Sequence, residues 1–363
     1  MASRYPESLR AAATSALLAV LGACAADTAT APIPPTIDRA ALDSLVSDVR
    51  EGDMGDIRSL LILVGDHAPL EYYFRGTGRN DALPVYSITK SITSLLTGIA
   101  LEVHAVDSVR APIRPLLPAH DALFAADARR ARITVEDLLT MRAGITWDEL
   151  SIPYTDPGNP VGTMLATQDW VGYVLSQPMA ADPGTRYAYS SGVTTLLGEV
   201  VARALRRPLA AFAQERLFGP LGIAPPSWHH ASNGVANAGG GLSLRALDLL
   251  RIGQLVRDRG RWGSVQLVPA SWIAASLTPH VGTTAIRYGY QWWMWGARGA
   301  WDPADPVFVA SGWGGQTVLV FPSRNAVVVV TALNFDRDPV RAAQALTQRL
   351  DAIFDKVPNA PVP

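Results

Sequence analysis

The chain has 363 residues, 48% of them hydrophobic and 17% charged, with 31 basic and 32 acidic side chains. This length is enough for one large domain or two fused subdomains with a sizeable core. The net charge of -1 argues against nucleic-acid binding, which needs a clustered surplus of basic side chains. The sequence has no Cys pair, no H-E-x-x-H motif and no His residues at ligand spacing, so we expect no metal and no other cofactor.

The first segment of the chain has the pattern of a bacterial secretory signal. Arg4 and Arg10 precede an apolar run over residues 11–23, and Cys24, the only cysteine, follows directly. A basic start, a short apolar stretch and small residues at its end are typical of a cleaved signal peptide. Leu21-Gly22-Ala23-Cys24 also resembles the lipobox of bacterial lipoproteins, in which the Cys is lipid-modified and begins the mature chain.

We therefore predict a signal peptide over residues 1–23 and a lipid-anchored tether over residues 24–36, which are rich in Ala, Thr and Pro. The alternative is an ordinary signal peptide with a chance cysteine. A mature chain without a second cysteine suits an oxidising compartment without disulfides. The expected location is the cell envelope, periplasmic or extracellular, with a lipid anchor in a bacterial membrane.

Strand patterns lie at both ends of the chain. They are apolar runs bounded by turn residues, over residues 58–64, 70–74, 307–310, 317–321 and 326–332. Helices are predicted over residues 37–50 and 340–354, with Asp38 and Asp338 near their starts. Residues 88–258 show mostly helical patterns and loops. The sequence thus predicts an α+β fold over residues 37–357. One antiparallel sheet is built from both chain ends and flanked by helices, and a mainly helical subdomain is inserted roughly over residues 103–235.

The main chemical signal is Ser87-Ile88-Thr89-Lys90, which opens a helix with apolar positions at 3.6-residue spacing. Ser87, Lys90, Ser91 and Ser94 fall on the opposite face. A Ser at a helix N-terminus lies in a positive field that favours a nearby oxyanion. A Lys one turn later can help to deprotonate this Ser if burial keeps the amine partly neutral.

The use of Lys at position 90 is unusual for this chain, which contains 29 Arg and only two Lys. Arg cannot give up its proton, whereas a buried Lys can, so the choice of Lys indicates a catalytic task. The alternative is a capped, surface-exposed helix start. An α/β-hydrolase is excluded, because the chain has no G-x-S-x-G motif.

Five segments together resemble the serine β-lactamase-related hydrolases. That family includes class C β-lactamases and other penicillin-binding-protein-like enzymes, D-alanyl-D-alanine carboxypeptidases, esterases and aminohexanoate-oligomer hydrolases. The segments are similar to its S-x-x-K helix, its I-T-x-x-x-L-L-T-M stretch, its P-G-x-x-F-x-Y-x-[NS] stretch, its G-G-L…D-L stretch and its K-T-G or H-x-G strand. They occupy residues 86–94, 133–147, 183–192, 239–249 and 310–316. The resemblance implies a β-lactamase/transpeptidase-like fold.

Carried over position by position, the resemblance makes Ser87 the nucleophile and Lys90 its activating partner. Tyr189 matches the tyrosine that works with the lysine as general base and later donates to the leaving group; Tyr187 is a nearby competitor. The oxyanion hole would use the backbone N–H of Ser87 and one from the strand, most simply that of Trp313. Oxyanion or substrate contacts are expected from Ser191, Ser311, Gly312 and Trp313.

Two positions depart from the family pattern. Ser191 stands where many relatives have Asn, and Ala310 stands where β-lactamases place a Lys that binds the substrate carboxylate. Arg287 or Arg298, reaching in from a loop, could replace that cation. Five Trp residues lie close together and either line an aromatic cleft or anchor the core: Trp292, Trp293, Trp295, Trp301 and Trp313.

The sequence is thus interpreted as a serine hydrolase that forms an acyl-enzyme at Ser87 and acts on a small ester or amide. Its partner is that small-molecule substrate, with membrane contact only through the lipid anchor and no nucleic acid. Two alternatives stay open. One is a non-catalytic or weakly catalytic penicillin-binding-like module for cell-wall peptides, and the other is a transacylase.

Overall fold

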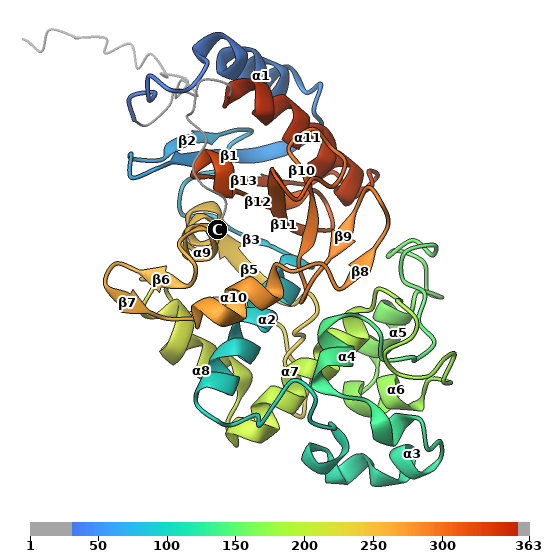
Figure 1. Cartoon of the computed structure of the whole chain (residues 1–363). Coiled ribbons are helices and arrows are strands. Elements are labelled where there is room, and N and C mark those ends of the chain that lie inside the picture. Colours follow the sequence, from blue (N-terminus) through green and yellow to red (C-terminus); the bar gives the residue numbers. More distant parts are fainter. Residues whose placement is uncertain (1–30, 355–363) are drawn as a thin grey trace, which may run out of the picture.

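An eight-stranded sheet joins the two ends of the chain in the computed structural model, which describes residues 31–354 (Figure 1). The signal peptide predicted over residues 1–23 and the lipidation site Cys24 lie outside the described residues. The strand order is β2-β1-β13-β12-β11-β10-β9-β8, and all the pairs are antiparallel. The strands are β1 (Ile57–Val64), β2 (Leu70–Tyr73), β8 (Val281–Gly282), β9 (Arg287–Tyr288), β10 (Trp293–Gly296), β11 (Pro306–Gly312), β12 (Gln316–Phe321) and β13 (Ala326–Ala332).

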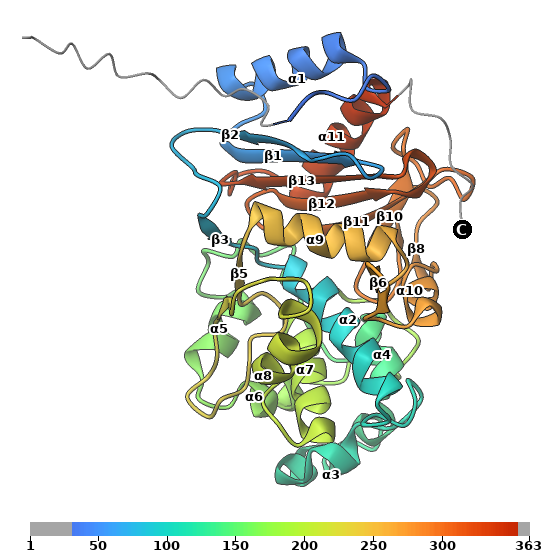
Figure 2. The same ribbon diagram turned by 90° about the vertical axis from the view of Figure 1, so that its left-hand side faces the viewer.

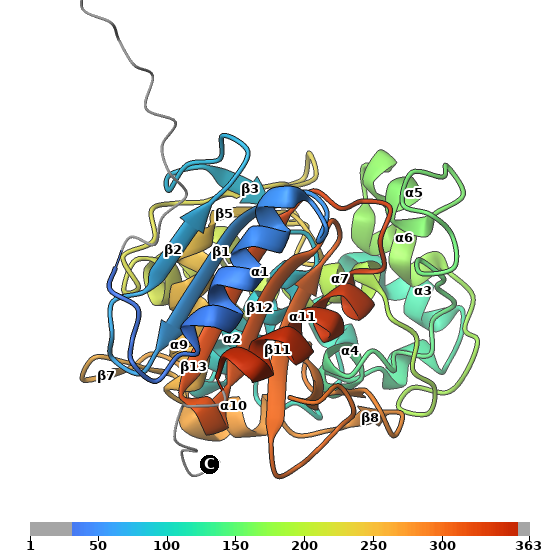
Figure 3. The same cartoon turned by 90° about the horizontal axis from the view of Figure 1, so that it is seen from above.

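The central strands are apolar on both faces because helices cover both sides of the sheet. Helices α1 (Arg39–Glu51) and α11 (Pro339–Ile353) lie side by side across one face (Figure 3). Helices α2 (Ile88–Glu102) and α9 (Ala246–Arg257) lie against the other (Figure 2). Alternate residues of β13 therefore enter different cores, Val327 and Val329 on the α9 side and Val328 and Val330 on the α1 side.

Both predicted terminal helices are confirmed, together with the side chains that start them. The Asp38 carboxylate accepts a hydrogen bond from the backbone N–H of Ala41, and the Asp338 carboxylate accepts two from the first turn of α11. Such N-caps satisfy donors that a helix start would otherwise leave unpaired.

The middle of the chain forms a helical region below the sheet in Figure 1. Between Arg114 and Phe218, the described residues contain helices but no strand of the named sheets. Short 3-10 turns lie before and among its α-helices, and a π-helical turn (Gln214–Phe218) follows the last of them. Those helices are α3 (Asp121–Ala125), α4 (Val135–Leu139), α5 (Pro160–Ala166), α6 (Trp170–Ser176), α7 (Ser191–Leu205) and α8 (Leu209–Ala213). The α+β fold with a helical insertion is confirmed.

A second sheet was not predicted. It has three short strands in the order β3-β5-β4, where β3 is Ala82–Pro84, β4 is Ser227–Trp228 and β5 is Leu242–Arg245. Strands of two to four residues are too short for an alternating pattern to identify them. The rest of the chain adds the hairpin β6–β7 (Arg261–Trp262 and Val265–Gln266) and α10 (Ala270–Ser276). No helix within residues 31–354 is both long enough and apolar enough to cross a membrane.

Candidate active site

Ser87 lies at the start of α2, directly after a strained turn. Tyr86 has a φ of +46°, in the left-handed region that non-glycine residues rarely occupy. Such strain persists only where the surrounding structure holds it, and it is common at functional sites. The Ser87 side chain makes no capping hydrogen bond to its own helix. Its hydroxyl instead contacts Lys90.

The Lys90 side chain is buried, with 1% of its surface exposed, and its ammonium donates to three oxygen atoms. Lys90 Nζ is 2.9 Å from Ser87 Oγ, 2.8 Å from Ser191 Oγ and 2.7 Å from the Gly239 carbonyl oxygen. Burial lowers the pKa of Lys90 to about 8, and the nearby Glu149 charge opposes this shift. The neutral amine is therefore accessible close to neutral pH.

The predicted polar face of α2 is not a solvent-exposed face. Every residue from Ile88 to Ala100 is buried, because α2 runs between the sheet and α7. Ser91 Oγ donates to the Gln291 carbonyl, and Ser94 Oγ has no hydrogen-bond partner in the described part of the chain. A capped helix start on the surface is therefore the wrong alternative for this segment.

Tyr189 lies beside Lys90 and lines the same cavity as Ser87. Lys90 Nζ is 4.8 Å from the centroid of the Tyr189 ring, which stacks on Trp293 at 5.5 Å. Burial raises the pKa of Tyr189, the Glu149 charge raises it further, and a hydrogen bond with Ser87 opposes both. Tyr189 is thus held as a neutral phenol. The competitor Tyr187 has a buried hydroxyl without a partner among residues 31–354 and does not line this cavity.

The end of β11 approaches Ser87 closely enough to require glycine at position 312. A Cβ on Gly312 would lie 2.3 Å from the Val85 carbonyl oxygen and 3.3 Å from the Ser87 backbone nitrogen. Within the described residues, neither the Ser87 N–H nor the Trp313 N–H donates to a backbone or side-chain acceptor. Ser311 Oγ is also buried without a partner in that range, and Ser311 lines the cavity. Three polar groups close to Ser87 in the described part of the chain are therefore left unpaired.

Ser191 begins α7 and contacts Lys90. Its Oγ accepts from Lys90 Nζ and donates to Glu149 Oε1 at 2.8 Å. Ser191 is not among the cavity-lining residues. The predicted contact between Ser191 and substrate stays a prediction, and in this structure both hydrogen-bonding directions of the hydroxyl are occupied.

The cavity around Ser87 has a volume of about 610 Å³ and a largely apolar wall. The Trp313 ring packs against Tyr154 and Phe335, at 5.2 Å and 4.7 Å between ring centroids. Leu150 and Phe335 also line the cavity and are 64% and 42% exposed, unusual values for large apolar side chains. The wall of the cavity thus includes large apolar side chains that are open to solvent.

The tryptophan cluster divides between the two predicted roles. Trp293 and Trp313 line the cavity, whereas Trp292 and Trp295 are fully buried core residues and Trp301 packs partly buried against the core. Three of the five tryptophans thus pack in or against the core, as expected from the large apolar surface of their rings.

None of the three positions considered in connection with a substrate carboxylate lines the cavity. Ala310 is buried in the core, and neither Arg287 nor Arg298 lines the cavity. Arg298 is instead an exposed side chain near Asp351. The arginine that does line the cavity is Arg337, an exposed residue just before α11. No sequence pattern distinguishes Arg337 from the other 28 arginines.

Glu149 is the functional candidate that the sequence prediction missed. It is buried and lines the cavity, and its charge raises the pKa of Lys90. Its only sequence signal was its place two residues after Trp147, at the end of a family-like segment. A lone glutamate in a loop has no periodicity or motif of its own. Within residues 31–354, no cluster of His, Cys, Asp and Glu has the arrangement of a metal site.

The antiparallel sheet, the central helix and the helical insertion together define the β-lactamase/transpeptidase fold. A family model described as Beta-lactamase matches residues 71–352, so the chain belongs to the Beta-lactamase family. The family predicted from the sequence is confirmed. A curated relative, 6-aminohexanoate-dimer hydrolase of Paenarthrobacter ureafaciens, is 24% identical over 262 residues. That alignment covers 66% of this chain and 64% of the relative, so the chain spans a little under two thirds of the relative's length.

Solved structures with much lower identity share the fold. EstCE1, described as a hydrolase with promiscuous acyltransferase activity, has a TM-score of 0.68 at 17% identity, with 86% of this chain and 97% of that chain covered. D-alanine carboxypeptidase AmpC from Burkholderia cenocepacia has a TM-score of 0.63 at 16% identity, with 85% and 97% covered. The chain is thus a member of the Beta-lactamase family and has the fold of these structures.

Proposed function

We propose that the protein is a serine hydrolase that forms an acyl-enzyme at Ser87 and acts on small esters or amides with an apolar group. The observation that carries the proposal is the 2.9 Å contact between Lys90 Nζ and Ser87 Oγ at a buried site. Because burial lowers the pKa of Lys90 to about 8, part of the amine is neutral near neutral pH and can accept the serine proton.

In the proposed reaction, Ser87 Oγ attacks the substrate carbonyl carbon while its proton passes to Lys90 Nζ. The negative oxygen accepts hydrogen bonds from the backbone N–H groups of Ser87 and Trp313. Tyr189, a neutral phenol, donates a proton to the leaving group as the C–O or C–N bond breaks, and Lys90 restores that proton. Water then attacks the acyl-enzyme and gives a proton to Lys90, which passes it to Ser87 Oγ as the bond between Oγ and the acyl carbon breaks and the acid leaves.

The proposed preference for apolar esters is supported by the cavity wall. Tyr154, Trp313 and Phe335 offer aromatic faces, and the exposed Leu150 extends the apolar surface outward. Ala310 supplies no charge where β-lactamases have a lysine, so a β-lactam carboxylate lacks that partner. Arg337 at the cavity is the cation that would have to replace it.

Acyl transfer to an alcohol is the second candidate. It is supported by EstCE1, which has the same fold and is described as having acyltransferase activity. Both reactions use one acyl-enzyme and differ only in the acceptor. A penicillin-binding-like module without turnover is disfavoured, because it would have no need of a buried lysine held against Ser87.

A fluorophosphonate probe tests the proposal directly, because it reacts with activated serine hydroxyls. We expect one label per chain, mapped to Ser87 by peptide mass spectrometry, and none in Ser87→Ala. A panel of p-nitrophenyl esters, peptides and β-lactams, with and without added alcohol, then separates hydrolysis from transfer. A wild-type protein that takes no label at Ser87 would contradict the acyl-enzyme.

We also propose a lipid anchor at Cys24, supported by the sequence pattern alone. An acyl chain contributes about 0.8 kcal/mol per buried CH₂, so several chains anchor a protein stably. In a bacterial host, the mature protein should partition with membranes and carry a modified N-terminal Cys24 by mass spectrometry. An unmodified N-terminus downstream of Cys24 would contradict the anchor.

A further inference from the structure

The carboxylate of Glu149 is buried among donors, and its hydrogen bonds extend to the catalytic lysine. Oε2 accepts from Trp147 Nε1 and from the Ser191 backbone N–H, both at 2.6 Å. Oε1 accepts from the Tyr154 hydroxyl at 2.9 Å and from Ser191 Oγ at 2.8 Å. The side chain is 1% exposed, so these bonds replace water.

The direction of each hydrogen bond around Ser191 follows from the number of protons. A hydroxyl has one proton, and an ionised carboxylate can only accept. The Ser191 proton therefore belongs to the bond with Glu149, and a lone pair of Ser191 Oγ faces Lys90 at 2.8 Å. Ser191 can accept from Lys90 but cannot donate to it.

A neutral lysine amine has two N–H bonds and one lone pair, and three oxygen atoms surround Lys90 Nζ. The Gly239 carbonyl, at 2.7 Å, is an acceptor only. Ser191 Oγ is confined to the acceptor role by Glu149. Both N–H bonds are therefore used, and the lone pair of the neutral amine is left for Ser87 Oγ at 2.9 Å.

We propose that Glu149 is a positioning residue for Lys90, because by holding the Ser191 proton it directs the lone pair of the neutral amine at Ser87. This inference rests on the proposed function of Ser87 and Lys90. Ser191 stands where many relatives have Asn, whose side-chain oxygen is an acceptor without outside help. In this chain a serine and a buried glutamate together provide that fixed acceptor.

Glu149→Gln reverses the hydrogen-bond direction with little change of shape. Trp147 Nε1 and the Ser191 backbone N–H can only donate, so the amide oxygen has to stay beside them. The amide nitrogen then replaces Oε1 and donates to Ser191 Oγ. The Ser191 proton turns toward Lys90 and takes up the lone pair that Ser87 needs.

The experiment is a double-mutant cycle on the rate of fluorophosphonate labelling of Ser87, with Glu149→Gln, Ser191→Ala and the double variant. We expect Glu149→Gln to slow labelling by about tenfold or more, but by less than about threefold when Ser191 is already Ala. An equal factor in both backgrounds would mean that Glu149 does not act through Ser191 and would overturn the inference. Wild-type labelling rates in Glu149→Gln would also overturn it.

The pH profile separates orientation from charge. Around Lys90, the titratable groups of the described residues are Glu149 and Tyr154 from the loop after α4 and Tyr189 ahead of α7. Because the Glu149 charge raises the pKa of Lys90, Glu149→Gln should move the acid limb of the labelling profile to lower pH. The rates are compared on the plateau above each midpoint, where Lys90 is neutral. Misdirection of the lone pair persists there, whereas a loss of charge alone does not slow labelling.

Two matched controls test for general effects of burial. Glu199→Gln changes another buried glutamate, on the same helix as Ser191, and Ser94→Ala removes another buried hydroxyl from the helix of Lys90. Both should label within about twofold of wild type. If Glu149→Gln fails to fold, Ser191→Ala alone decides the question, because a wild-type rate in that variant would overturn the inference. An unlabelled wild type contradicts the proposed function instead.

Discussion

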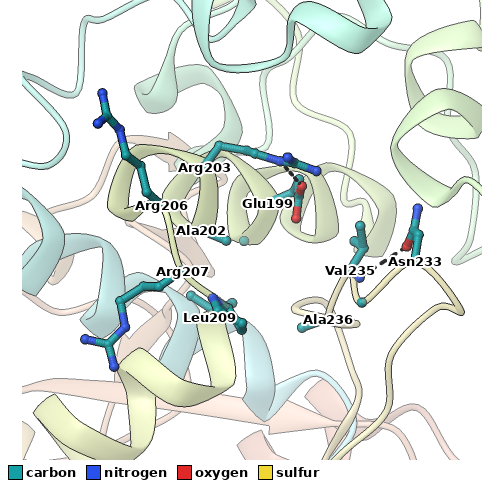
Figure 4. Close-up of a pocket in the computed structure, with 12 residues that line it drawn as sticks. Glu199, Ala202, Arg203, Arg206, Arg207, Leu209, Asn233, Val235 and Ala236 are labelled. Carbon is teal, nitrogen blue, oxygen red and sulfur yellow. Dashed lines mark hydrogen bonds and ion pairs between the residues drawn. The ribbon is translucent and has the colours of Figure 1, made fainter.

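Two cavities of this molecule each contain a buried glutamate, and they differ in what that glutamate holds. In the cavity at Ser87, the Glu149 carboxylate reaches Lys90 through the Ser191 hydroxyl. A second cavity of about 440 Å³ lies between α7, Leu209 and residues 233–236 (Figure 4). There the Glu199 carboxylate accepts directly from Arg203 Nε at 2.5 Å.

The second cavity is rich in arginine, but its charges are largely paired. Arg207 forms an ion pair with Glu215 at 2.9 Å. In Figure 4, Arg203 turns toward Glu199, whereas Arg206 and Arg207 point away from the loop that carries Asn233. An arginine keeps its proton at all ordinary pH values, so the arginine of a Glu–Arg pair cannot accept a proton from a nucleophile. Among the residues that line this cavity, none is a serine, lysine or tyrosine.

Burial and charge alone do not distinguish the two cavities. At the Ser87 cavity, a lysine that can lose its proton contacts the lining residue Ser87. Nearby groups have no partner within residues 31–354, namely Ser311 Oγ and the two backbone N–H groups. Unmatched polar groups around a titratable base provide a place for a substrate. In the second cavity, the basic side chains among the lining residues are all arginines.

The largest expected effect is the loss of turnover in Ser87→Ala. Removing the nucleophile should lower kcat for p-nitrophenyl butyrate by more than about 100-fold, because no acyl-enzyme can form. The matched control is Arg206→Gln in the second cavity, which should stay within about twofold of wild type. A comparable loss in Arg206→Gln would mean that the second cavity takes part in turnover.

Lys90→Arg should be almost as damaging as Lys90→Ala. The substitution keeps the positive charge but removes a base that can be neutral near pH 8. Both variants should lose more than about 100-fold in kcat, and the double variant with Ser87→Ala should be little worse than the poorer single variant. Circular dichroism and thermal melting check that each variant is folded. Near-normal turnover in Lys90→Arg would mean that Lys90 acts only through its charge. The ability to lose a proton would then not distinguish this cavity from the arginine-lined one.

Tyr189→Phe tests the donor role of the phenol. We expect a loss of about 100-fold in kcat for an alkyl ester or an amide, whose leaving group needs a proton. For a p-nitrophenyl ester the loss should be clearly smaller, because p-nitrophenolate leaves without protonation. Equal losses on both kinds of substrate would instead assign Tyr189 to serine activation.

The preference for esters over β-lactams should be about ten- to hundred-fold in kcat/KM. A missing charge-assisted hydrogen bond costs about 1.5–3 kcal/mol, and Ala310 cannot supply one. The measurement compares p-nitrophenyl butyrate with a chromogenic cephalosporin. Equal or higher efficiency on the cephalosporin would contradict this expectation. Arg337→Gln would then show whether that guanidinium replaces the missing lysine.

Much of the fold was predictable because its signals are local and regular. The apolar runs at both chain ends became β1, β11, β12 and β13, and Asp38 and Asp338 start the two helices that cover them. The three-stranded sheet was missed because its short strands are defined by pairing across long sequence separations, as between Leu83 and Leu244.

The site was predictable only where a motif carried it. Ser87, Lys90 and Tyr189 come from three segments with family-like patterns, and the structure brings them together. Glu149 and Arg337 are single charged residues in loops, and nothing in a loop sequence fixes where its side chain will lie. The role of Ser191 as an acceptor for Lys90 also depends on Glu149, which lies 42 residues away in the chain.

The smallest expected effect is the pH dependence of kcat/KM, which reports the free enzyme. Lys90 has to be neutral to accept the Ser87 proton, and burial lowers its pKa to about 8. The rate should therefore rise about tenfold per pH unit below pH 8 and level off above it. Tyr189 adds no falling limb just above this midpoint, because burial raises its pKa and keeps the phenol protonated. The arginines of the second cavity do not titrate in this range, so a midpoint near pH 8 cannot come from them. A profile that stays flat down to pH 6, or one whose midpoint lies near the ordinary lysine pKa of about 10.4, would show that the burial of Lys90 does not set its basicity.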